Sequence, residues 1–259
     1  MAIKIGHASI DENGKISGGK AGDQTGKEIH IRNWYSKPWN VYLECTDKIL
    51  ADKATKIMDE ICKNDNFGYD QVERWTGYNS IVKNRYVIAP SKGEFDCSSL
   101  IITCYILAGL PMSVDGYTGN LKAKLLKTGK FIAYTDKDHL NSDKYARRGG
   151  IYLKEGSHVV MALEDGSAYA NPYPEPTDTV YYDAVNQKIV CKGDAVKWVQ
   201  WELIADGITE VVLDSKKKKL TIDGECGRIT DAGIREYQRK HGLTIDGKAG
   251  PKTRTEMKK

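Results

Sequence analysis

Residues 96–108 read Asp96-Cys97-Ser98-Ser99-Leu100-Ile101-Ile102-Thr103-Cys104-Tyr105-Ile106-Leu107-Ala108. The run is almost wholly apolar after its polar start, and Gly109 and Pro111 follow it, which predicts a buried helix that ends there. Cys97 would lie in the first turn, where unpaired amides and the helix dipole favour the thiolate over the thiol. Cys104 of the same helix is expected to be a packing residue, because cysteine is among the most buried residue types.

The composition is typical of a soluble globular protein with one or two domains: 259 residues, 40% of them hydrophobic, and a formal net charge of +4. The lysine run 216–219 predicts a solvated loop, and without interleaved aromatic residues it does not indicate nucleic-acid binding. The first residues do not form a secretory signal, and no apolar run approaches the length of a membrane span. We therefore expect a monomer that is made in the cytoplasm, binds no nucleic acid and does not insert into a membrane.

The cysteines give no sign of a bound metal. None of them is part of a CxxC pair or of a close cluster with histidines, so we expect no zinc site, no cofactor and no disulfide scaffold. The six are Cys45, Cys62, Cys97, Cys104, Cys191 and Cys226.

The spacing of apolar residues predicts helices first and strands after them, an order typical of an α+β fold rather than of repeated βαβ units. Helices are expected from an N-cap at Thr46 to Ile61, and at 70–83, 97–108 and 120–128. Strands are expected at 4–10, 28–32, 39–45, 130–134, 151–154 and 157–163, with an Asp165-Gly166 turn leading to a last strand at 167–170.

A proline-rich stretch marks a domain boundary. Residues 171–178 read Asn-Pro-Tyr-Pro-Glu-Pro-Thr-Asp, and such a spacing of prolines cannot continue a strand ladder. We therefore divide the chain into a first domain at 1–175, a linker at 176–191 and a small second domain at 192–259.

The second domain contains an internal repeat. Leu220-Thr-Ile-Asp-Gly-Glu-Cys-Gly227 recurs as Leu243-Thr-Ile-Asp-Gly-Lys-Ala-Gly250. Each Asp-Gly predicts a tight turn, and each final glycine introduces a predicted helix. With a preceding helix, these would make a bundle of three helices, at 194–203, 228–241 and 251–258.

A thiolate nucleophile needs a base, a group that orients the base, and donors for the oxyanion. His158 begins the expected strand 157–163 directly after a glycine turn, so it is the candidate base for Cys97. Three other histidines are expected to be structural or surface residues, namely His30, His139 and His241.

Several of these residues together resemble a known family. Phe95-Asp-Cys-Ser-Ser-Leu100, followed by His158 on a strand and by Asp165-Gly166, resembles the NlpC-type papain-like cysteine peptidases and their relatives, the CHAP amidases. Gly6-His-Ala-Ser-Ile-Asp-Glu-Asn-Gly14 and Gly22-Asp-Gln-Thr-Gly26 are similar to phage lysins of this family.

The Asp-Gly repeat and Val196-Lys-Trp-Val-Gln200 resemble the three-helix peptidoglycan-binding domain. The resemblance, which covers nearly the whole chain, implies a papain-like α+β catalytic domain at 1–175 and a wall-binding domain at 192–259. The implied partner is bacterial peptidoglycan.

The resemblance implies Cys97 as nucleophile and His158 as base. In the common order of the family, the third catalytic residue follows the histidine by about one hairpin, often inside a His-Ala-Ser phrase. Here that phrase is His7-Ala8-Ser9, near the start of the chain, which resembles a circular permutation. We therefore expect the first strand to lie beside the His158 strand and His7 to orient the His158 ring. Asn171, in the ordinary position after the hairpin, is the alternative.

The oxyanion site is less well defined. Tyr69 resembles the family's oxyanion tyrosine, although its separation from Cys97 is longer than usual. Ser98 and Asp96, beside the nucleophile, are the other candidate oxyanion or substrate contacts. A further departure from similar lysins is Arg148-Gly149-Gly150, where those proteins have Gly-Asp.

The implied function is hydrolysis of an amide bond in the stem peptide, as an endopeptidase, after release from the cytoplasm by a holin-type pore or by lysis. An N-acetylmuramoyl-L-alanine amidase remains open, since the sequence does not display the pocket that selects the bond. Two other classes also remain open: a non-catalytic wall-binding protein with a buried Cys97, and an acyl transferase on the same scaffold.

Overall fold

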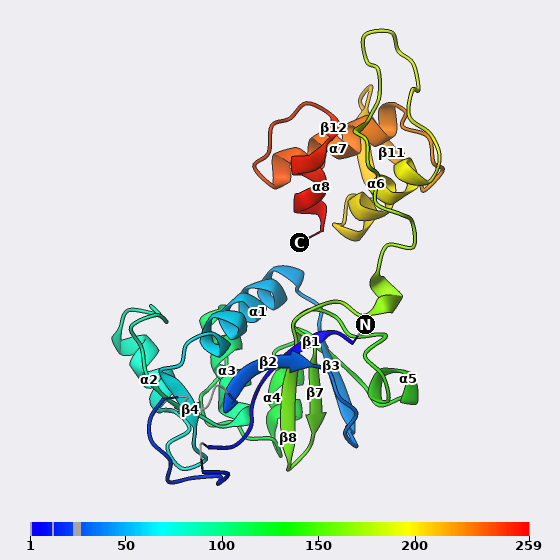
Figure 1. Ribbon diagram of the computed structural model, residues 1–259. Helices are drawn as coiled ribbons and strands as arrows, with labels where there is room; N and C mark the ends of the chain where they lie inside the picture. Colours follow the sequence, from blue (N-terminus) through cyan, green and yellow to red (C-terminus); the bar gives the residue numbers. More distant parts are fainter. Residues whose placement is uncertain (1, 12, 23–26, 259) are drawn as a thin grey trace. The chain divides into compact units, whose positions relative to one another are not determined.

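The computed structural model describes residues 2–11, 13–22 and 27–258, and the chain divides into two compact units, Met1–Ala170 and Asn171–Lys259 (Figure 1). Each unit has a hydrophobic core of its own. Residues 23–26 of the lysin-like segment that begins at Gly22 lie outside the described residues.

The first unit is built on a sheet in which, among the described residues, all neighbouring strands are antiparallel. The strand order is β2-β1-β8-β7-β3-β6. β1 therefore lies beside β8, the strand that begins with His158, as the position of the His7 phrase predicts. The strands span Lys4–Ala8 (β1), Ile29–Asn33 (β2), Val41–Cys45 (β3), Phe131–Tyr134 (β6), Ile151–Lys154 (β7) and His158–Ala162 (β8).

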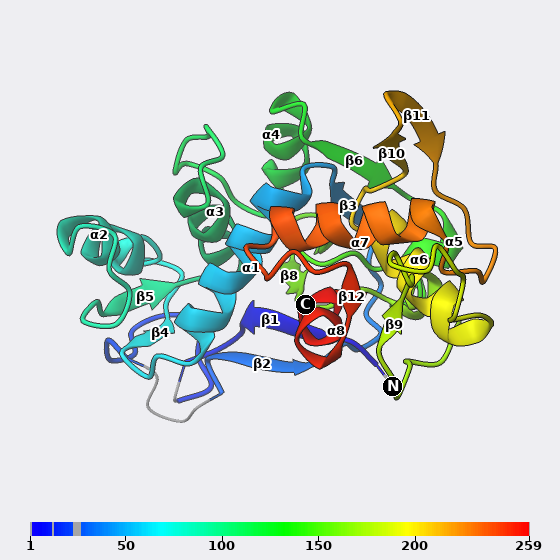
Figure 2. The ribbon, with the colours of Figure 1, turned by 90° about the horizontal axis from the view of Figure 1, so that it is seen from above.

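Two helices cover one face of this sheet. α1 (Lys48–Cys62) and α3 (Cys97–Leu107) pack against each other and against the sheet (Figures 1 and 2). Because side chains alternate along a strand, Val159 and Met161 of β8 face these helices and share a core with them. The combination of helices with an antiparallel sheet confirms the predicted α+β class.

The other face of the sheet carries a smaller aromatic core. Tyr42, Tyr152 and Val160 lie there with Ile5, all of them fully buried, and Trp39 packs beside them. β1 contributes to both faces, since Gly6 meets Met58 of α1 while its neighbours Ile5 and His7 point the opposite way.

Several elements of the first unit differ from expectation. α2 (Thr76–Lys83) begins six residues later than predicted, because the Asp70 carboxylate accepts hydrogen bonds from the amides of Val72 and Glu73 and holds them in a turn. The N-cap of α1 is Asp47 instead of Thr46. Three of the described elements were not predicted. Two are the strands β4 (Phe67–Tyr69) and β5 (Gly93–Phe95), which pair in parallel, and the third is the short helix α5 (Lys137–Leu140). The helix α4 (Leu121–Lys127) lies where a helix was expected.

The expected strand at 167–170 is wrong. Ser167–Tyr169 forms a 3₁₀ turn, because the amides of Gly166 and Ala168 donate to carbonyls of residues 146 and 144, which belong to a loop and not to a strand. No sheet edge is therefore offered to this segment.

The second unit consists of three helices, as the repeat predicts, with short strands between them (Figure 1). The run 216–219 is not a loop: it forms β11 (Lys216–Lys219), paired with β10 (Glu210–Leu213) through a turn in which Asp214 and Ser215 have positive φ. All four lysines of β11 are exposed. The helices are α6 (Asp194–Ala205), α7 (Arg228–Lys240) and α8 (Pro251–Met257).

The segment expected to be a linker is folded into the second unit. β9 (Val180–Tyr181) pairs with β12 (Lys248–Ala249), and Arg254 of α8 donates to the carbonyls of Thr177 and Asp178. The described residues 171–178 form no helix or strand, since the prolines lack the amides that either would need, and Tyr173 among them packs against the core of the second unit.

Each copy of the repeat makes an equivalent set of buried hydrogen bonds. The side-chain oxygen of Gln200 in α6 accepts from the amide of Gly224, and its nitrogen donates to Asp223 and Thr230. Gln238 in α7 makes the corresponding bonds to Asp246, Gly247 and Thr253. Each Asp-Gly loop is thus held by a glutamine of the preceding helix and a threonine of the following one.

Candidate active site

The N-terminus of α3 is capped by its own sequence. The Asp96 carboxylate accepts from the amide of Ser99 at 2.6 Å, and the Ser99 hydroxyl accepts from the amide of Asp96 at 2.9 Å. This reciprocal capping box fixes Cys97 as the first residue of the helix, as predicted. One oxygen of the Asp96 carboxylate serves the helix, and the residue is buried.

Helix α3, which begins at Cys97, packs against strand β8. The main-chain N–H groups of Val159 and Ser98 both lower the pKa of the Cys97 thiol, and the side chain is 6% exposed. Val159 directly follows His158 in β8. The thiol therefore lies at the start of the strand that carries the candidate base.

The protonation of Cys97 differs from the expectation for a helix N-terminus. Burial, followed by the negative charge of Asp96, raises the pKa of the thiol to about 12. The two N–H donors lower this pKa but do not offset the loss of hydration, so the raised pKa favours the thiol over the thiolate.

Arg74 is a residue of this site that sequence reasoning did not identify. Its Nη1 lies 2.8 Å from a carboxylate oxygen of Asp96, and its Nη2 donates to the Ser98 hydroxyl at 3.3 Å. Both charged side chains are largely buried, and the arginine lowers the pKa of the Cys97 thiol. No motif marks Arg74, because its partner lies far along the chain.

His158 belongs to a cluster of imidazoles on the aromatic face of the sheet. The rings of His158 and His7 lie 5.8 Å apart between centroids and nearly perpendicular, and Trp39 stacks on His158 at 6.1 Å. His7 in turn meets His30, with 3.4 Å between their Nε2 atoms. The structure therefore brings His7 beside His158, whereas His30, expected to be structural, joins the same cluster.

The positions of these rings follow from strand alternation. Val159 points toward α3, so His158, one residue earlier, points to the face where His7 and Trp39 lie. Cys97 belongs to the core on the helix side of the sheet, whereas the His158 ring lies with His7 and Trp39 on the other face.

The imidazoles of His7 and His158 are neutral at rest. Burial, then the positive charges of His30 and His158, lower the pKa of His7 to about 3. Burial, then the charge of Lys37, lowers the pKa of His158 to about 4. A neutral imidazole can accept a proton, as a general base must.

Two phenols lie within electrostatic range of the sulfur. Burial raises the pKa of Tyr69 to about 12, and the Cys97 charge contributes to that rise. Burial also raises the pKa of Tyr35, with Cys97 again contributing. Both hydroxyls stay protonated and can donate a hydrogen bond. Tyr35 was not identified from the sequence, since it lies between two strands in a stretch with no motif.

Asn171, the alternative third residue, makes its side-chain hydrogen bonds within the second unit. Its side-chain nitrogen donates to the carbonyl of Trp198 at 2.9 Å and to Glu202 at 3.0 Å, both in α6. His7 is the alternative whose ring contacts the His158 ring.

The remaining motif residues have structural contacts. His139 stacks on Tyr134 and bonds Asp136, and His241 stacks on Tyr237, in agreement with the prediction that both are structural. Arg148, the departure from similar lysins, donates to Asp52 of α1 and to the carbonyl that follows β8. It therefore ties α1 to the sheet.

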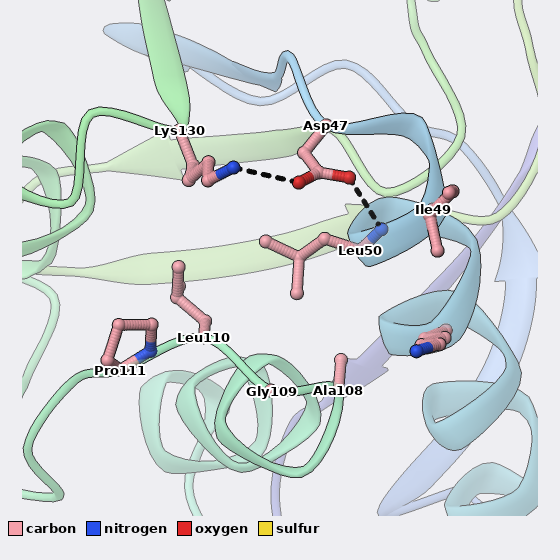
Figure 3. Close-up of a pocket in the computed structure, with 9 residues that line it drawn as sticks. Asp47, Ile49, Leu50, Ala108, Gly109, Leu110, Pro111 and Lys130 are labelled. Carbon is pink, nitrogen blue, oxygen red and sulfur yellow. Dashed lines mark hydrogen bonds and ion pairs between the residues drawn. The ribbon is translucent and has the colours of Figure 1, made fainter.

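A hollow at the other end of α3 carries none of the candidate groups. Ala108, Gly109 and Leu110 line it, together with the ion-paired Asp47 and Lys130 (Figure 3). In the part of the chain that the structure describes, no group of His, Cys, Asp and Glu side chains is arranged to hold a metal ion. No described helix is long and apolar enough to span a membrane.

Comparison with known families decides the class of the protein. Residues 5–169, which include β1, α3 and β8, match the model of an endolysin-like domain. The chain belongs to the endolysin-like domain family. Residues 192–257 match a peptidoglycan binding domain, so the endolysin-like domain is followed by a wall-binding module. This combination indicates a peptidoglycan hydrolase whose partner is peptidoglycan. No curated protein and no solved structure matches the chain.

Proposed function

We propose that the endolysin-like domain is a papain-like cysteine peptidase of the NlpC/CHAP type that cleaves an amide bond in the stem peptide of peptidoglycan. The observation that carries the proposal is the packing of helix α3, which begins at Cys97, against strand β8, which begins at His158. The His7 ring beside His158 supplies the orienting group that such a mechanism needs.

The chemistry starts from a neutral pair. As the Cys97 sulfur attacks the amide carbonyl carbon, His158 takes the thiol proton, and the tetrahedral oxyanion forms. His158 then gives that proton to the leaving amine, and the C–N bond breaks to leave a thioester on Cys97. Water, deprotonated by His158, attacks the thioester carbonyl and releases the acid and the thiol.

The oxyanion requires hydrogen-bond donors that are already in place. The phenols of Tyr69 and Tyr35, both protonated and both within electrostatic range of Cys97, support this role. The main-chain N–H of Cys97, at the first position of α3, is a third candidate donor. Asp96 and Ser98 act instead on the helix end, through the capping bonds and Arg74.

Within this function we favour an endopeptidase, with an N-acetylmuramoyl-L-alanine amidase as the alternative. The wall-binding module would raise the local concentration of the enzyme at its polymer, because tethering makes the second encounter intramolecular. The protein would reach the wall through a holin-type pore or after lysis.

The test uses purified peptidoglycan and mass analysis of the released fragments. Cys97→Ala should reduce release by at least about 10³-fold, since the nucleophile is removed, with the circular dichroism spectrum unchanged. Cys104→Ala, in the same helix and fully buried, is the matched control and should keep most of the activity. Fragment release by Cys97→Ala at the wild-type rate would refute the proposal, and the fragment masses identify the bond.

The third residue is tested separately. His7→Ala should lower kcat by about 10²-fold or more if His7 orients the base, whereas Asn171→Ala should not change kcat. Equal, full activity of both variants would exclude His7 as well as Asn171.

A second function is favoured by one observation, the 6% exposure of Cys97. A sealed thiol would suit a protein that binds the wall without cutting it. Labelling of the native protein with a small thiol reagent distinguishes the two, because a nucleophile must be reachable whereas a packing residue need not be. Hydrolysis and acyl transfer to an amine are separated by the masses of the products.

A further inference from the structure

Two cysteines of the second unit face each other across paired main-chain segments. Lys192 and Glu225 form an isolated antiparallel bridge. On one side of this bridge the main-chain N–H of Cys226 donates to the carbonyl of Cys191 at 3.1 Å. On the other side the main-chain N–H of Gly193 donates to the carbonyl of Gly224 at 2.8 Å. Residues 191 and 226 are therefore directly opposite one another.

This arrangement is close to the geometry of a disulfide. Directly opposite residues of an antiparallel pair have Cα atoms about 4.5–5.5 Å apart, within the range of about 4.4–6.8 Å found in disulfides, and their side chains leave the same face. Their Cβ atoms are about 4.5–5.5 Å apart and need to approach to about 3.5–4.5 Å, so closing the bond requires a small movement of the two segments toward each other. Burial, and then the charge of Cys191, raise the pKa of the Cys226 thiol, so the two thiols also influence each other electrostatically.

The two thiols differ in access. Cys226 is fully buried in the core of the unit, whereas Cys191 is half-buried at its edge and its thiol contacts the carbonyl of Thr179 at 3.7 Å. A reagent in solution would therefore meet Cys191 first, and Cys226 would act from within.

We propose that Cys191 and Cys226 are a disulfide-forming pair that closes when the protein meets a low-molecular-weight disulfide outside a reducing compartment. The Cys191 thiolate attacks one sulfur of the reagent RS–SR, forming a mixed disulfide and releasing RS⁻. Cys226, on losing its proton, attacks the Cys191 sulfur and expels the second RS⁻. The protons of the two thiols pass to the two RS⁻ groups, so two thiols and RS–SR give one protein disulfide and two RSH.

The bond would link the segment before α6 to the segment before α7. The closed loop contains α6, the β10–β11 hairpin and the first Asp-Gly turn. Such a crosslink stabilises a small domain by restricting its unfolded chain. The proposal does not depend on the catalytic role of Cys97.

The test treats the full chain with oxidised glutathione at mildly alkaline pH. We expect an intact mass lower by about 2 Da, the two hydrogens lost. Peptide mapping should place the new bond between Cys191 and Cys226. Calorimetry should show the unfolding of the second unit shifted upward by about 10 °C, reversed by dithiothreitol.

Cys191→Ser is the control variant, because Cys191 is half-buried and the fold should tolerate a hydroxyl there. The oxidant should change neither the mass nor the unfolding temperature of this variant. Cys62 and Cys104 lie on helices and not on paired segments, so they are the internal comparison and should stay reduced. An unchanged intact mass, or glutathione retained on Cys191 as a mixed disulfide, would overturn the proposal.

Discussion

The main-chain N–H of Val159 in strand β8 lowers the pKa of the Cys97 thiol at the start of helix α3. The two elements are distant in sequence, and their packing brings Cys97 to the strand that begins with His158. The thiol is not ionised at rest, because burial and the Asp96 charge outweigh the N–H donors. The resting site is therefore a neutral thiol and a neutral imidazole.

The charge of Asp96 should control the reactivity of the thiol. Asp96→Asn keeps an effective N-cap but removes the carboxylate, so the pKa of Cys97 should fall by about one unit and alkylation by iodoacetamide near pH 8 should become about tenfold faster. Arg74→Gln is the opposite control and should slow alkylation, since it leaves Asp96 uncompensated. Equal rates in all three proteins would mean that neither charge acts on the sulfur.

The pH dependence of hydrolysis should report the buried His158. Its pKa is lowered to about 4, and protonation removes the general base, so kcat/KM should fall only as the pH drops through about 4. The rate of cleavage of a soluble stem-peptide fragment, measured from about pH 3 to about pH 8, would locate this limb. A limb near pH 6.5, the value of a hydrated imidazole, would show that His158 is not desolvated in the working enzyme.

His7 should make the stability of the first unit depend on pH. Its folded pKa of about 3 lies below the ordinary 6.5, so the unfolded state binds the extra proton between these values. Stability is therefore complete above about pH 6.5 and is lost as the pH falls, by about 1.4 kcal/mol per unit for one such group.

His7→Gln should remove the contribution of one proton to the pH dependence of the free energy of unfolding, which urea unfolding at several pH values would measure. His158 contributes in the same direction between about pH 6.5 and its lowered pKa of about 4, so some slope should remain. An unchanged slope in His7→Gln would indicate that His7 is protonated in the fold.

Gln200 should be essential for the second unit because it donates and accepts at once. Gln200→Glu keeps the shape but replaces the donor that meets Asp223 and Thr230 by an oxygen, which should cost about 2–4 kcal/mol in the free energy of unfolding. Gln238→Glu should cost a similar amount. The exposed Gln187→Glu should have almost no effect, and a comparable loss there would point to charge alone.

Removing the second unit should separate binding from catalysis. A chain ending at Ala170 should lose most of its affinity for insoluble peptidoglycan, measured by co-sedimentation, while cleaving a soluble fragment at a rate near that of the full chain. If both properties fall together, the second unit is needed for more than attachment.

Much of the site could be predicted from local sequence. The capping residues and the apolar run placed Cys97 at the first turn of α3, and alternation placed His158 at the start of β8. His7 was predicted from the three-residue motif His7-Ala8-Ser9. Arg74, Tyr35 and His30 were not predicted, because each acts on the site through a partner distant in the chain and no local pattern records that proximity.

The sequence by itself determined the α+β class, the helix-borne cysteine and the duplicated Asp-Gly phrase, because capping, periodicity and turn chemistry act between residues a few positions apart. Only the tertiary structure decided that the thiol is protonated, that Asn171 belongs to the second unit, and that Cys191 faces Cys226. Burial, strand neighbours and ion pairs depend on which segments, distant in sequence, pack against each other in the fold. At Cys97 the loss of hydration favours the thiol, whereas the helix N-terminus alone would favour the thiolate.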